Sequence, residues 1–131
     1  MAAMYACYHG PRGLRKIAGR VHGLTCFLAA GITRLGHTLK HQSYFDTLAV
    51  SHASQNAADL ADIAAACRVN LRVLDKNTIG IALDETSTEA DITELLQIFN
   101  EGRDVPFALD ELTTAEVIPE SLRRTSEFLT H

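Results

Sequence analysis

The feature that most constrains this chain is a stripe of apolar residues that runs at spacings of three and four through its first third. The members of the stripe are Leu14, Ile17, Val21, Leu24, Leu28, Ile32 and Leu35. Such spacing is typical of the buried face of an amphipathic helix. Pro11 suits a first helical position, and Gly36 suits a left-handed stop. The sequence therefore predicts a helix over 11–35, about 37 Å long.

The opposite side of this predicted helix is basic, and it carries Arg12, Arg15, Lys16 and Arg20. A phosphate cradle is the less favoured interpretation, because it needs free backbone amides at the helix start, where the proline has none. The first 50 residues carry six Lys and Arg against one acidic residue, whereas the remainder carries six against fifteen. This basic part could meet a phosphate, an acidic partner or acidic groups of its own molecule, and we favour the last. Few aromatic residues accompany it and the net charge is −4, so nucleic acid is not an expected partner.

Three later segments alternate polar and apolar side chains, as strands with one buried face do. The first covers 43–50, and the other two cover 69–73 and 79–83. The run Asp75–Asn77 between the last two has turn chemistry, so these strands are predicted to form a β-hairpin.

Two further helices are predicted around this hairpin. Residues 56–67 are rich in alanine with apolar residues at helical spacing, and Thr88 with Asp91 forms a capping-box pattern before a helix that Gly102 ends. The order of elements predicts an α+β fold, with a small, mostly antiparallel sheet covered by helices on one face. We assign residues 1–102 to this domain and 103–131 to an extended arm, with a short helix near 114–118.

Nothing in the sequence predicts a membrane span or an export signal. The longest apolar-rich run, Leu24–Ile32, is far shorter than the roughly 20 residues that a spanning helix needs. Residues 1–10 lack a basic start followed by a clean apolar stretch, so a signal peptide is not expected. We expect a cytoplasmic or organelle-matrix protein. Residues 1–8 have the pattern of the end of a helix that begins upstream, and we expect a piece of a larger protein.

The cysteine and histidine patterns predict no metal site. Cys7, Cys26 and Cys67 are widely spaced with no C-x-x-C pair, so we expect buried free thiols. His37 and His41 have the i,i+4 spacing of zinc ligands, but they follow a glycine in a turn with no glutamate between them. A zinc site there is the less favoured interpretation.

No nucleophile and base arrangement, phosphate loop or dinucleotide motif is present in the sequence. The adjacent carboxylates Asp84 and Glu85 could serve acid–base chemistry, but neighbours at a strand end usually point apart, and we favour solvated capping. Asp46 lies near Tyr44 and could be functional, although a hydrogen bond at the strand edge is favoured. The residues alone thus predict an α+β unit of a larger assembly.

Four runs closely resemble one known family. They are "MYACYHGPRGLRKIAGRVHGLTCFLAAGITRLGH", "YFDTL", "GIALDET" and "RTSEFLTH". In this order they are similar to glycine dehydrogenase (decarboxylating), the P-protein of the glycine cleavage system. The resemblance implies a segment from the end of the first half of that protein, mainly the small C-terminal domain of a fold-type I enzyme that uses pyridoxal phosphate. It also implies glycine decarboxylation, transfer of the aminomethyl group to the lipoyl carrier H-protein, and a dimeric parent.

The family's cofactor lysine lies in its second half and follows a histidine. The lysines of this chain are Lys16, Lys40 and Lys76, and they follow arginine, leucine and aspartate. None matches, so we assign no catalytic, cofactor-binding or metal-binding residue and expect no pyridoxal phosphate on this segment alone. Two alternatives stay open: a stand-alone amino-acid-binding regulatory module, and the small domain of another fold-type I enzyme.

Overall fold

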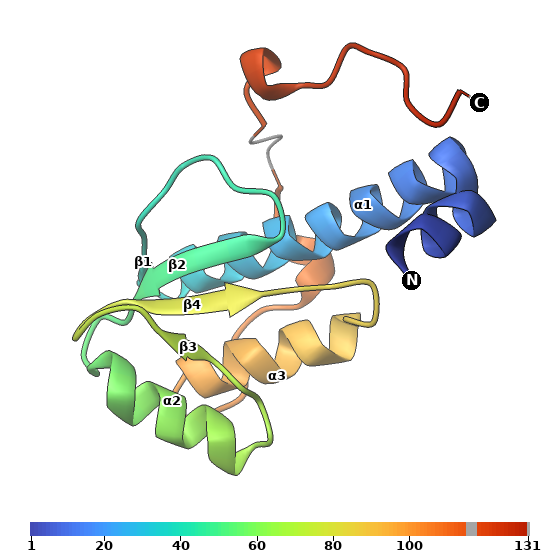
Figure 1. The fold of residues 1–131 in the computed structure, drawn as a ribbon. Helices are drawn as coiled ribbons and strands as arrows, with labels where there is room; N and C mark the ends of the chain where they lie inside the picture. Colours follow the sequence, from blue (N-terminus) through green and yellow to red (C-terminus); the bar gives the residue numbers. More distant parts are fainter. Residues whose placement is uncertain (115–117, 131) are drawn as a thin grey trace.

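The computed structural model describes residues 1–114 and 118–130 and has the predicted α+β architecture (Figure 1). Its helices are α1 (Ala2–Arg34), α2 (Ala57–Ala66) and α3 (Glu89–Phe99). Its strands are β1 (Thr38–Leu39), β2 (Thr47–Ser51), β3 (Arg72–Val73) and β4 (Ile79–Ala82). Two short 3₁₀ turns, Leu109–Glu111 and Glu120–Leu122, lie in the arm.

The four strands form one antiparallel sheet in the order β1-β2-β4-β3. In the central pair Leu48 lies opposite Ile81 and Val50 opposite Ile79, so these four side chains share one face. All four are buried in one core together with apolar residues from the three helices. The helices therefore cover one face of the sheet, as predicted. Strand β1 was not predicted, because two residues are too few to show an alternating pattern.

Helix α1 begins nine residues before the predicted start at Pro11 and is sharply bent. Gly10 has φ 62° and ψ 178°, which is outside the helical region and costs glycine little. A Cβ at Gly13 would lie 3.0 Å from the Cβ of His9, so this turn also needs a small residue at 13. The first two turns of α1 fold back against its long part (Figure 1). The helical pattern of residues 1–8 and the long helix after Pro11 are both confirmed.

Helix α1 ends in the predicted glycine stop. Gly36 has φ 91°, its amide donates to the carbonyl of Thr33 at 3.0 Å, and the amide of His37 donates to the carbonyl of Ile32 at 3.1 Å. These two bonds satisfy carbonyls that the helix end would leave free. The end of the helix thereby aims the chain into β1.

The predicted hairpin and capping box are both confirmed. The side chain of Asp75 accepts the amide of Asn77 at 2.8 Å and closes the turn between β3 and β4. Thr88 and Asp91 exchange side-chain and backbone hydrogen bonds at the start of α3. The strands are shorter than predicted: β2 begins at Thr47 rather than Ser43, and β3 has two residues.

The end of helix α2 is followed by Arg68, which is not a glycine although its backbone lies in the left-handed region. Arg68 has φ 63°, and the amide of Val69 donates to the carbonyl of Ala64 at 2.9 Å in the usual terminal pattern. A Cβ in this conformation costs about 1 kcal/mol, which glycine avoids. We expect Arg68→Gly to raise the free energy of unfolding by about 1 kcal/mol in chemical denaturation. Arg68→Ala, which keeps the Cβ, should leave it nearly unchanged, and an equal gain in both variants would contradict this explanation.

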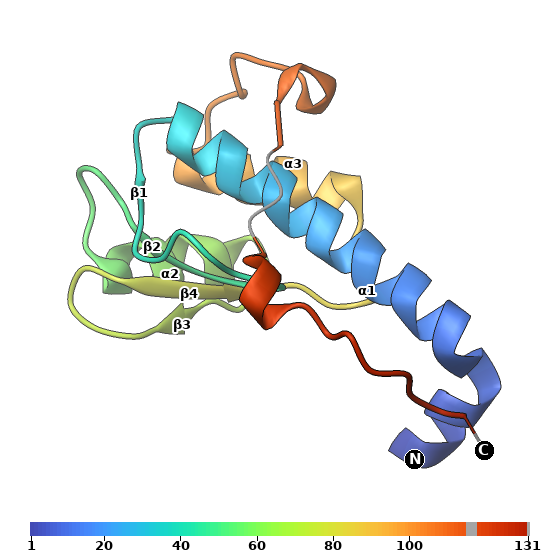
Figure 2. The same ribbon diagram turned by 90° about the horizontal axis from the view of Figure 1, so that it is seen from above.

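The arm packs along the domain through aromatic side chains. The guanidinium of Arg34 lies 4.5 Å from the ring centre of Phe107, and that of Arg15 lies 5.1 Å from that of Phe128. Residues 118–130 run beside α1 towards its bent end (Figure 2). The division of the chain at residue 102 stays a prediction. The short helix predicted near 114–118 lies largely outside the described residues.

Candidate functional site

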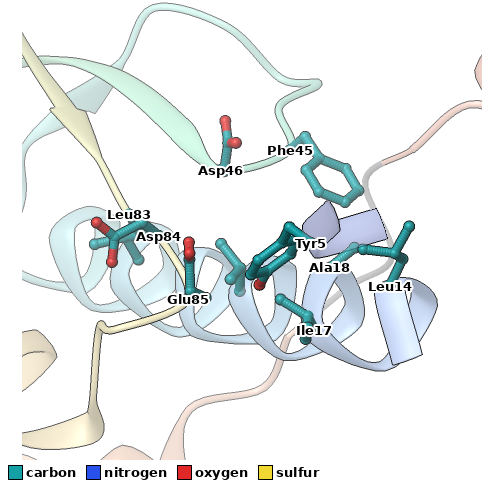
Figure 3. Close-up of a pocket in the computed structure, with 10 residues that line it drawn as sticks. Tyr5, Leu14, Ile17, Ala18, Phe45, Asp46, Leu83, Asp84 and Glu85 are labelled. Carbon is teal, nitrogen blue, oxygen red and sulfur yellow. The ribbon is translucent and has the colours of Figure 1, made fainter. Parts of the chain in front are cut away.

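A hollow with an apolar floor lies where the long part of α1 passes the ends of β2 and β4 (Figure 3). Its volume is about 370 Å³. It is lined by Tyr5, Leu14, Ile17, Ala18, Val21, Phe45, Asp46, Leu83, Asp84 and Glu85. Residues of the helical stripe thus form the floor, and the carboxylates come from the chain just before β2 and just after β4.

Two of the carboxylates at this hollow, those of Asp84 and Asp46, accept hydrogen bonds from nearby residues. Asp84 accepts the amide and the hydroxyl of Thr86 at 2.8 and 2.7 Å, and these hydrogen bonds, the hydroxyl first, lower the pKa of its carboxyl. The side chains of Asp84 and Glu85 point in different directions (Figure 3). A general acid would need a raised pKa, so the capping interpretation is confirmed. Asp46 accepts the hydroxyl of Thr47 at 2.9 Å, which confirms the favoured hydrogen bond at the strand edge.

Arg20 holds the loop that follows β4. Its Nη1 donates to the carbonyl of Glu85 at 3.1 Å and its Nη2 to the carbonyl of Ser87 at 2.6 Å. The basic side of α1 is exposed, as predicted. The expected meeting with acidic groups of the same molecule occurs only at Arg34, which pairs with Glu111 at 3.3 Å, and at none of the four basic residues named above among the described ion pairs. Arg20 differs, because it binds backbone carbonyls instead of carboxylates.

Two histidines from distant parts of the chain stack beneath the end of α3. The ring centres of His37 and His52 are 4.1 Å apart, and Nε2 of each donates to the carbonyl of Phe99 at 3.0 Å. Nδ1 of His37 accepts the amide of Ala53 at 3.1 Å, so the neutral ring fits these partners. Burial, and then the nearby His52, lower the pKa of His37. No spacing rule could have predicted this pair, because the two histidines are 15 positions apart in the chain.

A zinc site at His37 and His41 stays the less favoured interpretation, because both ring nitrogens of His37 already have protein partners. His37 is buried with both ring nitrogens bonded, whereas His41 is exposed. Within residues 1–114 and 118–130, no group of three or more candidate metal ligands comes together.

The prediction of buried thiols is right for one cysteine and wrong for two. Cys26 is buried, and its Sγ lies 3.6 Å from Nε2 of His22, whose Nδ1 donates to a carbonyl at 2.8 Å. Burial raises the pKa of the Cys26 thiol and raises the pKa of Tyr44 beside it to about 12, so neither is activated as a nucleophile. Cys7 and Cys67 are exposed, because the bend after Cys7 and the end of α2 face solvent. All three are free thiols.

Comparison with known proteins settles the family. The family model described as "Glycine cleavage system P-protein" matches residues 1–99. The chain belongs to this family. Glycine dehydrogenase (decarboxylating) of Vibrio cholerae is 49% identical over the whole chain and that of Nostoc is 41% identical, while the mitochondrial protein of Pisum sativum is 45% identical. The chain spans only 12–14% of the length of these relatives. The resemblance inferred from the four runs is therefore confirmed.

A solved structure extends the comparison of this P-protein segment to its fold. A NifS-like protein superposes with a TM-score of 0.62 at 20% identity, over 69% of this chain and 29% of that protein. At this identity the likeness concerns the fold alone. It agrees with the predicted small α+β domain.

The residues of this P-protein segment do not fit a complete site for pyridoxal phosphate. Lys16, Lys40 and Lys76 are all exposed, and none lines the hollow in Figure 3. The ionisable lining there consists of carboxylates and a tyrosine, and the guanidinium tips of Arg20 already donate to carbonyls. A Schiff base needs a lysine and a phosphate needs cationic or amide donors, so we derive no step through the cofactor. The assignment of no cofactor or catalytic residue stays a prediction.

None of the helices in residues 1–114 and 118–130 has the length and apolar character to cross a membrane.

Proposed function

We propose that this chain is a structural segment of a glycine decarboxylase. The longer protein would decarboxylate glycine and pass the aminomethyl group to the lipoyl carrier H-protein. Pyridoxal phosphate, when bound there, would act as the electron sink for decarboxylation. The supporting observation is 49% identity across the entire chain with a glycine dehydrogenase (decarboxylating).

In this proposal the segment supplies a small domain against which the rest of the enzyme packs, and the lysine that holds the cofactor lies elsewhere in the longer protein. The exposed positions of Lys16, Lys40 and Lys76 support that division. The partners would be the remaining parts of the P-protein, in a dimeric parent, and the H-protein. The bacterial and mitochondrial relatives support a cytoplasmic or organelle-matrix location.

A chimera tests the proposal. The matching segment of the Vibrio cholerae relative is replaced by this chain, and release of labelled carbon dioxide from glycine is measured in the presence of pyridoxal phosphate and H-protein. We expect the chimera to retain glycine decarboxylation and a version with the segment deleted to lose it. A folded chimera that releases no carbon dioxide would contradict the proposal.

No observation favours a stand-alone amino-acid-binding module. The thermal stability of the 131-residue chain should not change with glycine or serine, because ligand stabilisation requires a site in the folded state. Clear stabilisation by one free amino acid would restore that alternative.

A further inference from the structure

A second hollow lies next to the one in Figure 3, at the N-terminal turns of α1. The second hollow, of about 670 Å³, is lined by Met1, Ala2, Met4, Tyr5, Tyr8 and Glu85. Tyr5 and Glu85 belong to both linings, so the two hollows are neighbours, and we call the surface that they form together the Tyr5 groove.

Most of the exposed large hydrophobic side chains of the described residues line the Tyr5 groove. Eight large hydrophobic side chains are exposed in the described residues, and five of them line this groove. Met4 is 76% exposed and Tyr8 is 86% exposed, although both could bury a large area. Apolar patches of this kind mark surfaces that another protein segment covers.

The rim of the Tyr5 groove is acidic, and its carboxylates form no ion pair with another described residue. Asp46, Asp84 and Glu85 stand at the rim, whereas the ion pairs of the described residues lie at Glu111 and Glu101. Both terminal nitrogens of Arg20 donate to carbonyls of the neighbouring loop. The groove therefore complements an apolar segment that brings its own positive charge.

The charges argue against a second copy of this chain as the occupant. In a two-fold interface each copy presents the same patch to the other, so two Tyr5 grooves would bring six carboxylates together. A different segment avoids this repulsion. The chain covers only 14% of its Vibrio cholerae relative, so most of such a protein lies outside the segment described here.

We propose that the Tyr5 groove receives a segment from the remaining P-protein polypeptide, one that carries a lysine or arginine between apolar side chains. The basic side chain lies at Glu85, and the apolar side chains cover Met4 and Tyr8. This inference rests on the proposed function, because it takes the chain to be part of a longer P-protein.

Photocrosslinking in the chimera described above tests the inference. A benzoylphenylalanine replaces Tyr8, a second preparation carries it at Met4, and a control carries it at Asp62, which is exposed on α2. We expect crosslinks from positions 8 and 4, but not from 62, to one segment of the same polypeptide that contains a lysine or arginine. Glu85→Lys should abolish these crosslinks. In the Glu85→Lys protein, changing the lysine or arginine of the crosslinked segment to glutamate should restore them.

The inference is wrong if positions 8 and 4 give no stronger crosslinks than position 62. It is also wrong if the crosslinks lead to a second copy of the chain, or if Glu85→Lys leaves their yield unchanged. The chimera without a photoprobe separates this question from the proposed function. An active chimera without the crosslinks contradicts only the groove assignment, whereas an inactive chimera with them contradicts only the proposed glycine decarboxylation.

Discussion

Replacing Gly31 with alanine is expected to lower the free energy of unfolding by about 2 kcal/mol, although alanine favours a helix more than glycine does. Gly31 of α1 faces Leu96 of α3. A Cβ there would lie 2.6 and 2.8 Å from the two methyl carbons of Leu96. Leu96 is completely buried, so it has little room to move away. The overpacking therefore outweighs the gain in helix propensity, and chemical denaturation followed by circular dichroism measures the difference.

Gly23 provides the matched control on the same helix. A Cβ at Gly23 meets no atom within 4 Å, so Gly23→Ala should raise the free energy of unfolding by about 1 kcal/mol. In the Gly31→Ala background, Leu96→Ala should cost less than it does alone, since it relieves the clash. Equal stabilisation by the two glycine replacements would show that α1 and α3 do not approach as described.

The second large effect is expected at His37. His37→Ala should lower the free energy of unfolding by about 2 kcal/mol at neutral pH, because the carbonyl of Phe99 and the amide of Ala53 each lose a partner. The stability should also depend on pH. The folded state holds the pKa of His37 below its ordinary value of 6.5, so the unfolded state binds more protons. The stability that neutral His37 contributes is present in full above the pKa of His37 in the unfolded chain. It is lost as the pH falls through the lower pKa of His37 in the folded chain.

His37→Gln separates titration from hydrogen bonding, because glutamine can still donate to Phe99 but does not titrate. Denaturation curves between about pH 7 and 5 should show a smaller loss of stability for this variant than for the unchanged chain. Glu101 acts in the opposite direction, because its carboxylate raises the pKa of His37. The control is His41→Gln at an exposed histidine nearby. The pH dependence of stability would not be due to His37 if His41→Gln changed it and His37→Gln left it unchanged.

Local patterns predicted most of the fold because their causes are local. The apolar stripe of α1, the stop at Gly36, the turn at Asp75 and the capping of α3 by Thr88 each depend on residues within a few positions of one another. The unexpected features need distant partners or a bend. Strand β1 exists because β2 pairs with it, and the bend at Gly10 depends on a backbone conformation that the sequence only permits.

The candidate site was less predictable, because it also depends on contacts between residues that are distant in the sequence. Asp46, Asp84 and Glu85 could each be noted in the sequence, but their common hollow depends on the pairing of β2 with β4 and on the position of α1. The contact of Arg20 with residues 85 and 87 and the stacking of His37 on His52 join segments that no spacing rule connects. Exposure of Cys7 and Cys67 likewise depends on which side of each helix meets the core.

We expect this segment to build a scaffold for a P-protein, and another part of that protein to anchor the cofactor. Pyridoxal phosphate is titrated into the 131-residue chain and, in parallel, into the active chimera; each mixture is reduced with borohydride, and labelled lysines are mapped by mass spectrometry. We expect a bound-cofactor absorbance band and one specifically labelled lysine in the chimera, outside the transplanted residues, and neither of them in the chain alone. Specific labelling of Lys16, Lys40 or Lys76, together with glycine turnover by the chain alone, would contradict this expectation.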